Sequence, residues 1–211
     1  MNKYQMAMGL FIDFYDPREW ASSPHEQGDY VYASEGHIAI QIKKELVGAE
    51  YMPVEKPDFL HVFNKDRNRD ETLTLSAMEK TYESIPMVDE EMCSACYGCG
   101  KVDFKFEWEE ETYTETGTCP VCGGTGYVES SEFRKDDRYM VRIYKDCTPV
   151  KQEYFGIIVG AMKTLGLDSI RLVTFDSYAY IFETGEGVRF AVGSCVPGDN
   201  NIVINHKEEP G

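Results

Sequence analysis

The sequence predicts an α+β fold, with helices packed on antiparallel sheet and a cysteine-rich hairpin inserted between two halves of the chain. Three observations carry this prediction. Apolar residues recur at helical spacing in three segments, β-rich runs joined by short turns lie between them, and two similar cysteine–glycine octets occupy residues 93–100 and 119–126.

The bulk composition limits the class of protein. The 211 residues are 42% hydrophobic and 13% aromatic, values typical of a folded globular chain. The formal net charge of −16 repels phosphate backbones at long range, so nucleic-acid binding would require a local basic face. No apolar run approaches the roughly 18 residues of a membrane span. No signal peptide is evident either, so we expect a cytoplasmic protein without a membrane partner.

Residues 1–90 are expected to form an N-terminal α+β half. Helical spacing predicts a first helix through Tyr4, Met8, Phe11 and Tyr15. Two β-rich runs within 30–42 predict a hairpin, and the apolar run 59–63 and polar loop 64–71 carry no clear assignment. A second helix is predicted by the 3-4-3 spacing of Leu75, Met78, Tyr82 and Ile85, and Pro86 would end it.

Residues 131–197 are expected to form a C-terminal β-α-β-β-β half. Its predicted elements are a strand at 138–144, a helix at 152–166, and strands at 169–175, 179–183 and 188–192. Gly166 is a candidate C-cap for the helix. The remaining residues, 198–211, are expected to be a flexible tail.

Both octets have the pattern C-x-x-C-x-G-x-G. Two residues between cysteines let both sulfurs reach one ion from a tight turn, and four thiolates suit the tetrahedral coordination of structural zinc. The glycines permit positive φ and turn backbone amides toward the thiolates. We therefore predict that Cys93, Cys96, Cys119 and Cys122 bind one zinc ion within a hairpin inserted at 91–130.

Other interpretations of the cysteines stay open. The rival register uses Cys96 and Cys99 and leaves Cys93 free, but it does not place the glycines of the two octets alike. A disulfide pair would need an oxidising compartment, and a redox C-x-x-C is expected at a strand-to-helix junction. An iron–sulfur site is a further alternative, because Cys99 supplies a spare thiolate.

The segment between the octets predicts a strand with one apolar face. Its apolar residues alternate with charged ones, at Val102, Phe104, Phe106 and Trp108. The acidic run 107–115 is interpreted as the solvated face or tip of the hairpin.

CSACYGCG and CPVCGGTG resemble the C-x-x-C-x-G-x-G knuckles of DnaJ-type zinc fingers. Those domains carry four repeats and bind two zinc ions, so two repeats imply one ion per chain. The chain lacks the His-Pro-Asp tripeptide of a J-domain. The resemblance therefore implies the metal geometry, and as an alternative function a peptide-binding or unfolded-protein-binding module.

A second resemblance covers much of the remaining chain. YASEGHIAIQI (32–42) resembles the Thr-Asp-Gly-His-type hairpin of DNA-polymerase sliding-clamp subdomains, with Glu35 where an aspartate is usual. The stretch from RYMVRIY (138–144) to Pro197 resembles the β-α-β-β-β half of a clamp. The whole chain also resembles proteins carried by phages and other mobile elements. This resemblance implies a clamp-like fold interrupted by the zinc hairpin, and an association with DNA replication.

Three groups of basic residues are candidates for a DNA-binding face. They are Lys43 and Lys44; Lys65, Arg67 and Arg69; and Arg134, Lys135, Arg138, Arg142 and Lys145. Scattered solvated charge is the alternative interpretation. The four histidines are dispersed, no H-E-x-x-H occurs, and Cys147 and Cys195 are expected to be structural. We therefore expect a non-enzymatic, zinc-stabilised binding or scaffold protein that acts through a protein partner or self-association.

Overall fold

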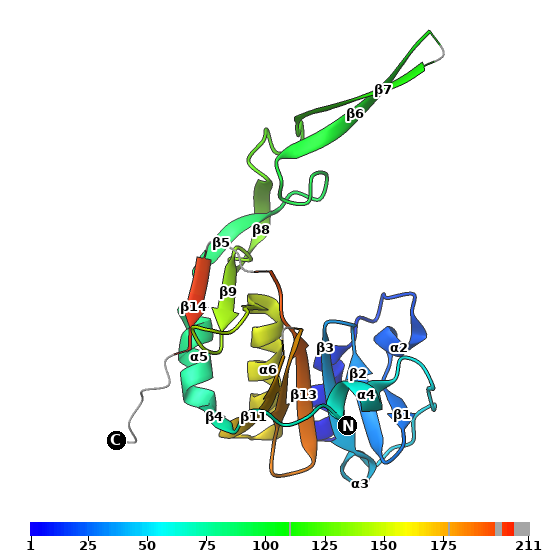
Figure 1. Cartoon of the computed structure of the whole chain (residues 1–211), viewed down its shortest axis with the longest axis vertical. Helices are drawn as coiled ribbons and strands as arrows, with labels where there is room; N and C mark the ends of the chain where they lie inside the picture. Colours follow the sequence, from blue (N-terminus) through cyan, green and yellow to red (C-terminus); the bar gives the residue numbers. More distant parts are fainter. Residues whose placement is uncertain (110, 177, 197–199, 205–211) are drawn as a thin grey trace. The chain divides into compact units, whose positions relative to one another are not determined.

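The structure, a computed structural model, describes residues 1–109, 111–176, 178–196 and 200–204. The chain forms two compact units, which are drawn in Figure 1. Unit 1 comprises Met1–Ser84 and the chain from Arg138 onward, and unit 2 is the intervening segment Ile85–Asp137. No helix in the described part of the chain is long and apolar enough to cross a membrane.

Within the described residues, unit 1 is built on a seven-stranded sheet of order β1-β2-β3-β13-β12-β11-β4. These strands are β1 (His25–Gln27), β2 (Tyr30–Ser34), β3 (Ile38–Lys43), β4 (Glu71–Thr74), β11 (Ser169–Phe175), β12 (Ala179–Glu183) and β13 (Val188–Gly193). Every neighbouring pair is antiparallel. The predicted 30–42 hairpin and the predicted strands at 169–192 are both present, and the pairing of β3 with β13 joins them.

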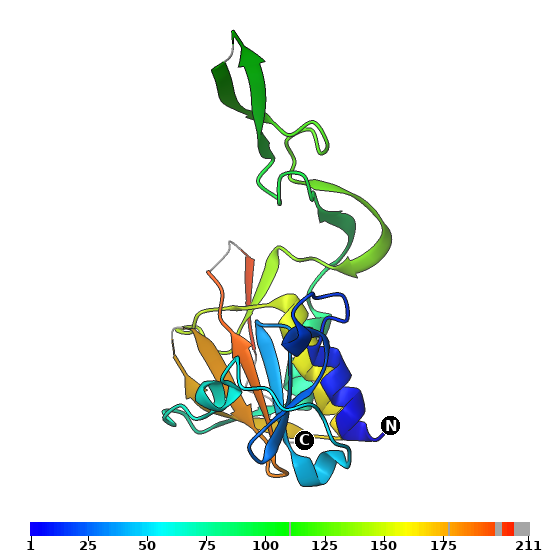
Figure 2. The same ribbon diagram turned by 90° about the vertical axis from the view of Figure 1, so that its right-hand side faces the viewer.

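Helices cover both faces of this sheet. They are α1 (Lys3–Met8), the 3-10 helix η1 (Gly9–Phe11), α2 (Glu19–Ser22), α3 (Lys44–Val47), α4 (Phe59–Phe63), α5 (Leu75–Glu83) and α6 (Gln152–Leu165). Figure 2 shows α1 and α6 on one face and α4 on the other. Phe11 stacks on Phe190 on the first face, and Phe59 stacks on Tyr32 on the second. Both faces therefore bury aromatic rings.

The two best-defined helices agree with their sequence signals. α6 ends at Leu165, and Gly166 follows in the left-handed conformation with φ 73°. α5 begins after Thr74, whose hydroxyl oxygen accepts a hydrogen bond from the amide of Ala77 at 3.2 Å. Its last helical residue precedes Pro86, as the sequence predicts.

The first helix is shorter than predicted. The α-helix ends at Met8 and continues only as the 3-10 turn η1, and Tyr15 is 95% exposed instead of lying on a helical face. The carboxylate of Asp13 accepts a hydrogen bond from the amide of Tyr15 at 2.9 Å. Such local side-chain bonding competes with helical hydrogen bonding, so the apolar spacing continues past the point where the helix stops.

A smaller sheet of order β10-β9-β14 uses residues near the C-terminus of the chain. Its strands are β9 (Tyr139–Arg142), β10 (Val150–Lys151) and β14 (Asn200–Val203). β14 pairs in parallel with β9, so residues 200–203 form a strand where a flexible tail was expected. Residues 198–199 and 205–211 of that tail lie outside the described residues.

Unit 2 consists of two antiparallel strand pairs connected by the cysteine octets. β5 (Met87–Met92) pairs with β8 (Tyr127–Lys135), and β6 (Lys101–Trp108) pairs with β7 (Glu111–Thr118). β6 is the strand predicted from the alternation at 102–108. The unit extends beyond the expected 91–130 segment, because β5 and β8 add residues at both of its ends. The sequences of these two strands are mostly polar and carry no period-two apolar signal.

Candidate metal centre

Two cysteine turns of similar shape lie between the strand pairs of unit 2. The first follows β5 and the second follows β7. The amide of Cys93 donates to the carbonyl of Gly126 at 2.8 Å, and the amide of Cys119 donates to the carbonyl of Gly100 at 2.9 Å. Each turn is therefore hydrogen-bonded to the last glycine of the other.

These turns bring four sulfur atoms together. The Sγ atoms of Cys93, Cys96, Cys119 and Cys122 all lie within 4.8 Å of one another. The Cys93–Cys119 and Cys96–Cys122 sulfur separations are 3.8 and 3.7 Å. A tetrahedron with Zn–S bonds of about 2.3 Å has edges of about 3.8 Å, so this donor spacing fits one four-coordinate ion.

Backbone amides point at two of the sulfurs in matching positions. The amide of Gly100 donates to the Sγ of Cys96 at 3.3 Å, and the amide of Gly126 donates to the Sγ of Cys122 at 3.2 Å. Hydrogen bonds of this kind stabilise thiolates and orient metal ligands. The equivalence shows that each C-x-x-C-x-G-x-G repeat supplies its own donor.

The thiols have different environments. Burial raises the pKa of Cys96 to about 12, against the hydrogen bond from Gly100. Burial also opposes ionisation of Cys122, but hydrogen bonds from Gly126 and Gly124 lower its pKa to about 6. Like charges this close raise one another's pKa, so four ionised thiolates here are compatible with a bound cation.

The glycines of the octets are also required by packing. A Cβ atom at Gly100 would lie 2.2 Å from the carbonyl oxygen of Gly124, and one at Gly126 would lie 2.3 Å from that of Gly98. Gly100 and Gly126 also have positive φ, at 71° and 84°. Close approach of the two turns therefore excludes any side chain at these two positions.

Cys99 lies outside the four-sulfur cluster. Its side chain is exposed and donates to the carbonyl of Lys101 at 3.1 Å. Thr125 occupies the equivalent position of the second octet and donates to the carbonyl of Tyr127 at 2.8 Å. The geometry thus groups Cys93, not Cys99, with the other three sulfurs.

None of the seven cysteines, all of which the structure describes, forms a disulfide. Cys147 is buried in unit 1. Cys195, also in unit 1, is half-buried, and its sulfur lies 3.2 Å from the carbonyl oxygen of Pro149. Burial raises the pKa of both thiols, which does not favour nucleophilic reactivity.

The apolar face of the β6–β7 hairpin is open to solvent. Its aromatic residues are Phe104, Phe106, Trp108 and Tyr113, with exposed fractions of 44, 50, 65 and 40%. The rings of Phe106 and Tyr113 stack at 5.4 Å across the strand pair. The same face carries Glu111 and Glu115, which pair with Trp108 and Phe104 in the strand register. Alternation in the sequence indicated this face, but it could not show that the face is uncovered.

Most of the basic candidates have partners in the structure. Six form ion pairs: Lys43 with Glu45, Lys44 with Glu26, Lys65 with Asp176, Arg67 with Glu183, Arg69 with Glu71, and Arg134 with Asp137. Arg142 donates to the carbonyl of Cys147 and Lys135 to that of Ile85. Arg134 and Lys135 belong to unit 2, and the others belong to unit 1.

No protein-family model matches the chain, and no curated protein matches it in sequence. Among solved structures it is similar to the DNA polymerase III beta subunit of Caulobacter crescentus, with 10% identity and a TM-score of 0.49 over 93% of this chain and 65% of that one. A putative DNA polymerase III beta subunit from Eubacterium rectale gives 8% identity and a TM-score of 0.49 over 93% and 64%. The Helicobacter pylori beta clamp bound to a DNA ligase peptide gives 8% and 0.49 over 92% and 62%.

These neighbours are bacterial sliding clamps, the class whose subdomains the sequence resembles. The chain spans less than two thirds of the length of each. The likeness assigns neither an activity nor a partner to this chain.

Proposed function

We propose that this chain is a non-enzymatic binding or scaffold protein in which unit 2 is held together by one structural zinc ion. The observation that carries the proposal is the cluster of four cysteine sulfurs within 4.8 Å. Four protein ligands fill a tetrahedral coordination sphere, whereas a catalytic zinc keeps one position open for water or substrate. The metal would therefore act on folding rather than on a substrate.

Elemental analysis of the purified full chain tests the zinc assignment. We expect one zinc per chain, and we expect Cys93→Ser to lose it while Cys99→Ser retains it. An iron signal with visible charge-transfer absorbance would instead assign the cluster to iron. Equal zinc content in the two variants would contradict the ligand set.

The scaffold part of the proposal concerns unit 1. The sequence resemblance to sliding-clamp subdomains supports a role in contacts with a replication protein, or with a second copy of the chain. The ion pairing of six basic candidates favours a protein partner over DNA, because paired cations offer less net charge to a phosphate backbone.

Light scattering at increasing protein concentration tests self-association, and duplex binding at increasing salt tests DNA contact. We expect any duplex binding to be weak with a shallow salt dependence. A steep slope of log K against log salt would contradict the preference for protein, because phosphate contacts release counterions.

A second candidate function is favoured by the open aromatic face of the β6–β7 hairpin. Exposed aromatic residues gathered on one face are typical of protein interaction sites. The carboxylates of Glu111 and Glu115 on that face suit a peptide that carries both apolar and basic side chains. Unit 2 would then be a peptide-binding module in which the cysteine turns hold the β6–β7 hairpin in place.

Binding of a labelled peptide with alternating leucine and lysine tests this candidate. We expect Trp108→Ala to weaken binding at least tenfold without changing zinc content. Lys105→Ala, on the opposite face of the hairpin, is the matched control and should bind as the natural chain does. If Trp108→Ala instead unfolds unit 2, the face is structural and the candidate fails.

A further inference from the structure

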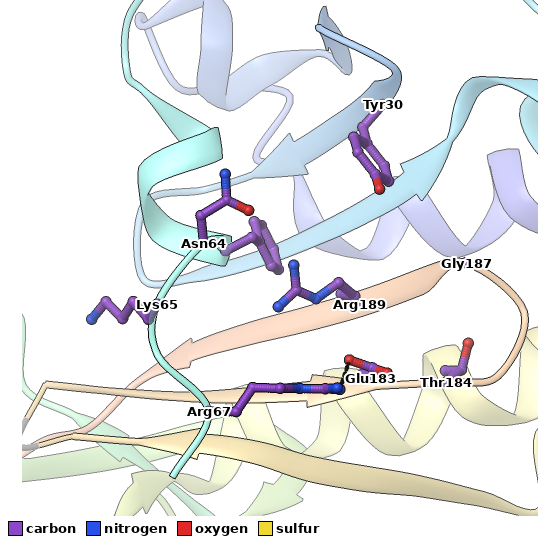
Figure 3. A pocket seen from close by; sticks show the side chains of 9 residues that line it. Tyr30, Asn64, Lys65, Arg67, Glu183, Thr184, Gly187 and Arg189 are labelled. Atoms are coloured by element: carbon purple, nitrogen blue, oxygen red, sulfur yellow. Dashed lines mark hydrogen bonds and ion pairs between the residues drawn. The ribbon is translucent and has the colours of Figure 1, made fainter.

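A hollow of about 560 Å³ opens on unit 1, beside α4 and the ends of β12 and β13. Figure 3 shows the residues that line it, which come from β2, from the end of α4 and the segment after it, and from β12, β13 and the turn between them. Its volume lies within the range of roughly 300–1,000 Å³ typical of sites for small ligands. The sequence analysis named two of its lining residues, Lys65 and Arg67, as candidates for DNA binding, but it did not predict the hollow itself.

Arg189 is the central cation of the hollow. Figure 3 places its guanidinium between Asn64 and Arg67. The guanidinium also lies over the ring of Phe63, with its central carbon 5.6 Å from the ring centroid. Its Nε atom is buried, and no described residue accepts a hydrogen bond from it. A buried donor without an acceptor is costly.

The surroundings of Arg189 favour an anion. Arg67 and Arg171 both pair with Glu183, whose carboxylate oxygens they divide between them. Although burial opposes ionisation, these hydrogen bonds lower the pKa of Glu183. The carboxylate of Glu183 therefore already has two guanidinium partners. Arg189 has no ion pair within the described chain.

The other polar groups that line the hollow include donors. They are the side-chain amide of Asn64 and the hydroxyl of Tyr30. A donor-rich wall with two guanidiniums fits a ligand whose polar atoms are acceptors. A phosphoryl group offers three such oxygens and pairs with arginine in a bidentate manner.

We propose that this hollow binds a phosphomonoester, whose phosphoryl oxygens accept hydrogen bonds from Arg189 and Arg67. The inference does not depend on the metal in unit 2 or on the aromatic hairpin. The phosphoryl oxygens would bond the terminal nitrogens of the two guanidiniums, because the Nε atom of Arg189 is buried and out of their reach. The rest of the hollow would hold the organic part of the ligand.

Titration calorimetry of the full chain with inorganic phosphate and with adenosine monophosphate tests the proposal. We expect saturable one-site binding of both, and at least a tenfold loss of affinity in Arg189→Gln. Arg18→Gln is the matched control, because Arg18 also lies over an aromatic ring, that of Trp20, but has Asp16 as its own partner. The control should bind as the natural chain does.

Two further measurements keep the test independent of folding. Arg189→Gln should melt no lower than the natural chain, because it removes a half-buried cation whose Nε atom has no acceptor. Glu183→Gln should bind phosphate severalfold more tightly, because Arg67 then loses its competing carboxylate.

Equal phosphate affinity of the natural chain and Arg189→Gln would overturn the proposal. Acetate binding as tightly as phosphate would overturn the phosphoryl assignment, and tighter binding of a thymidine oligonucleotide than of the mononucleotide would overturn the monoester.

Discussion

The two units of this chain are stabilised by different means. Unit 1 buries aromatic and aliphatic side chains on both faces of its sheet, with Phe11, Tyr32, Phe155 and Phe190 almost fully inaccessible. In unit 2 the buried residues among those described are Ile85, Cys93, Cys96, Gly100, Cys119, Gly126 and Asp136. Most of that short list belongs to the cysteine turns.

This difference indicates where each unit obtains its stability. Burial of apolar surface supplies most of the folding free energy of an ordinary domain. A segment the size of unit 2, with so few buried apolar side chains, usually needs a metal or disulfides to fold. The contrast therefore predicts that unit 1 folds without metal and that unit 2 does not.

Removal of the metal should have the largest effect. Structural zinc sites contribute apparent free energies of roughly 10–16 kcal/mol, far more than the small core of unit 2 can replace. Under reducing conditions with a strong chelator, we expect amide protection to be lost across residues 93–126. Protection across α6 and β11–β13 should persist. Hydrogen exchange followed by mass spectrometry separates the two regions, and simultaneous loss in both would contradict the comparison.

Substitution at a glycine of the cysteine turns should have the second-largest effect. Gly126→Ala would place a Cβ atom 2.3 Å from the carbonyl oxygen of Gly98, so the two turns must separate. We expect this variant to lose zinc to a chromophoric competitor at much lower competitor concentrations. Gly123→Ala is the control, because φ there is also positive at 62° but nothing lies within 4 Å. It should cost only about 1 kcal/mol.

Truncation of a core ring should affect unit 1 alone. Phe155→Ala should lower the free energy of unfolding by about 3–5 kcal/mol, while zinc content stays unchanged. The two tryptophans allow separate detection, because Trp20 lies in unit 1 and Trp108 in unit 2. Phe106→Ala, at a half-exposed ring of unit 2, should change stability by no more than about 0.5 kcal/mol. A comparable loss in both variants would remove the distinction between the units.

Loss of the charge on Glu183 should have a smaller effect, confined to unit 1. The pKa of Glu183 is lowered in the folded chain from the usual 4.5, so its contribution is present above that pH and is lost below it. The difference in unfolding free energy between the natural chain and Glu183→Gln should therefore be largest at neutral pH. Because the ion pairs of Glu183 with Arg67 and Arg171 are partly exposed, we expect this difference to be about 1 kcal/mol. Denaturant titrations at pH 7 and pH 3.5 measure it, and a constant difference would contradict the assignment.

Periodicity in the sequence predicted the elements whose burial is one-sided and regular. The helical spacing through Phe155, Ile158, Met162 and Leu165 matches the buried face of α6, and Gly166 ends the helix as expected. The cysteine spacing likewise predicted the four clustered sulfurs, because the glycine positions distinguish Cys93 from Cys99. In these places local sequence and tertiary structure carry the same information.

Elsewhere the deciding interactions are not local. β5 and β8 pair through backbone groups although their side chains are mostly polar, so no apolar pattern marks them. The short strand β4 is placed by its pairing with β11, about a hundred residues away. The sequence predicted a strand at 188–192, but only the structure shows that Arg189 lines a hollow and that its buried Nε atom has no acceptor among the described residues.

The ends of unit 2 lie close together. The amide of Asp136 donates to the carbonyl of Pro86 at 2.9 Å, so the chain enters and leaves the unit at neighbouring points. A gene could therefore acquire or lose the whole of unit 2 in a single in-frame event, with little change to the path of the surrounding chain. The cysteine turns and the sheet of unit 1 are therefore expected to evolve under separate selection.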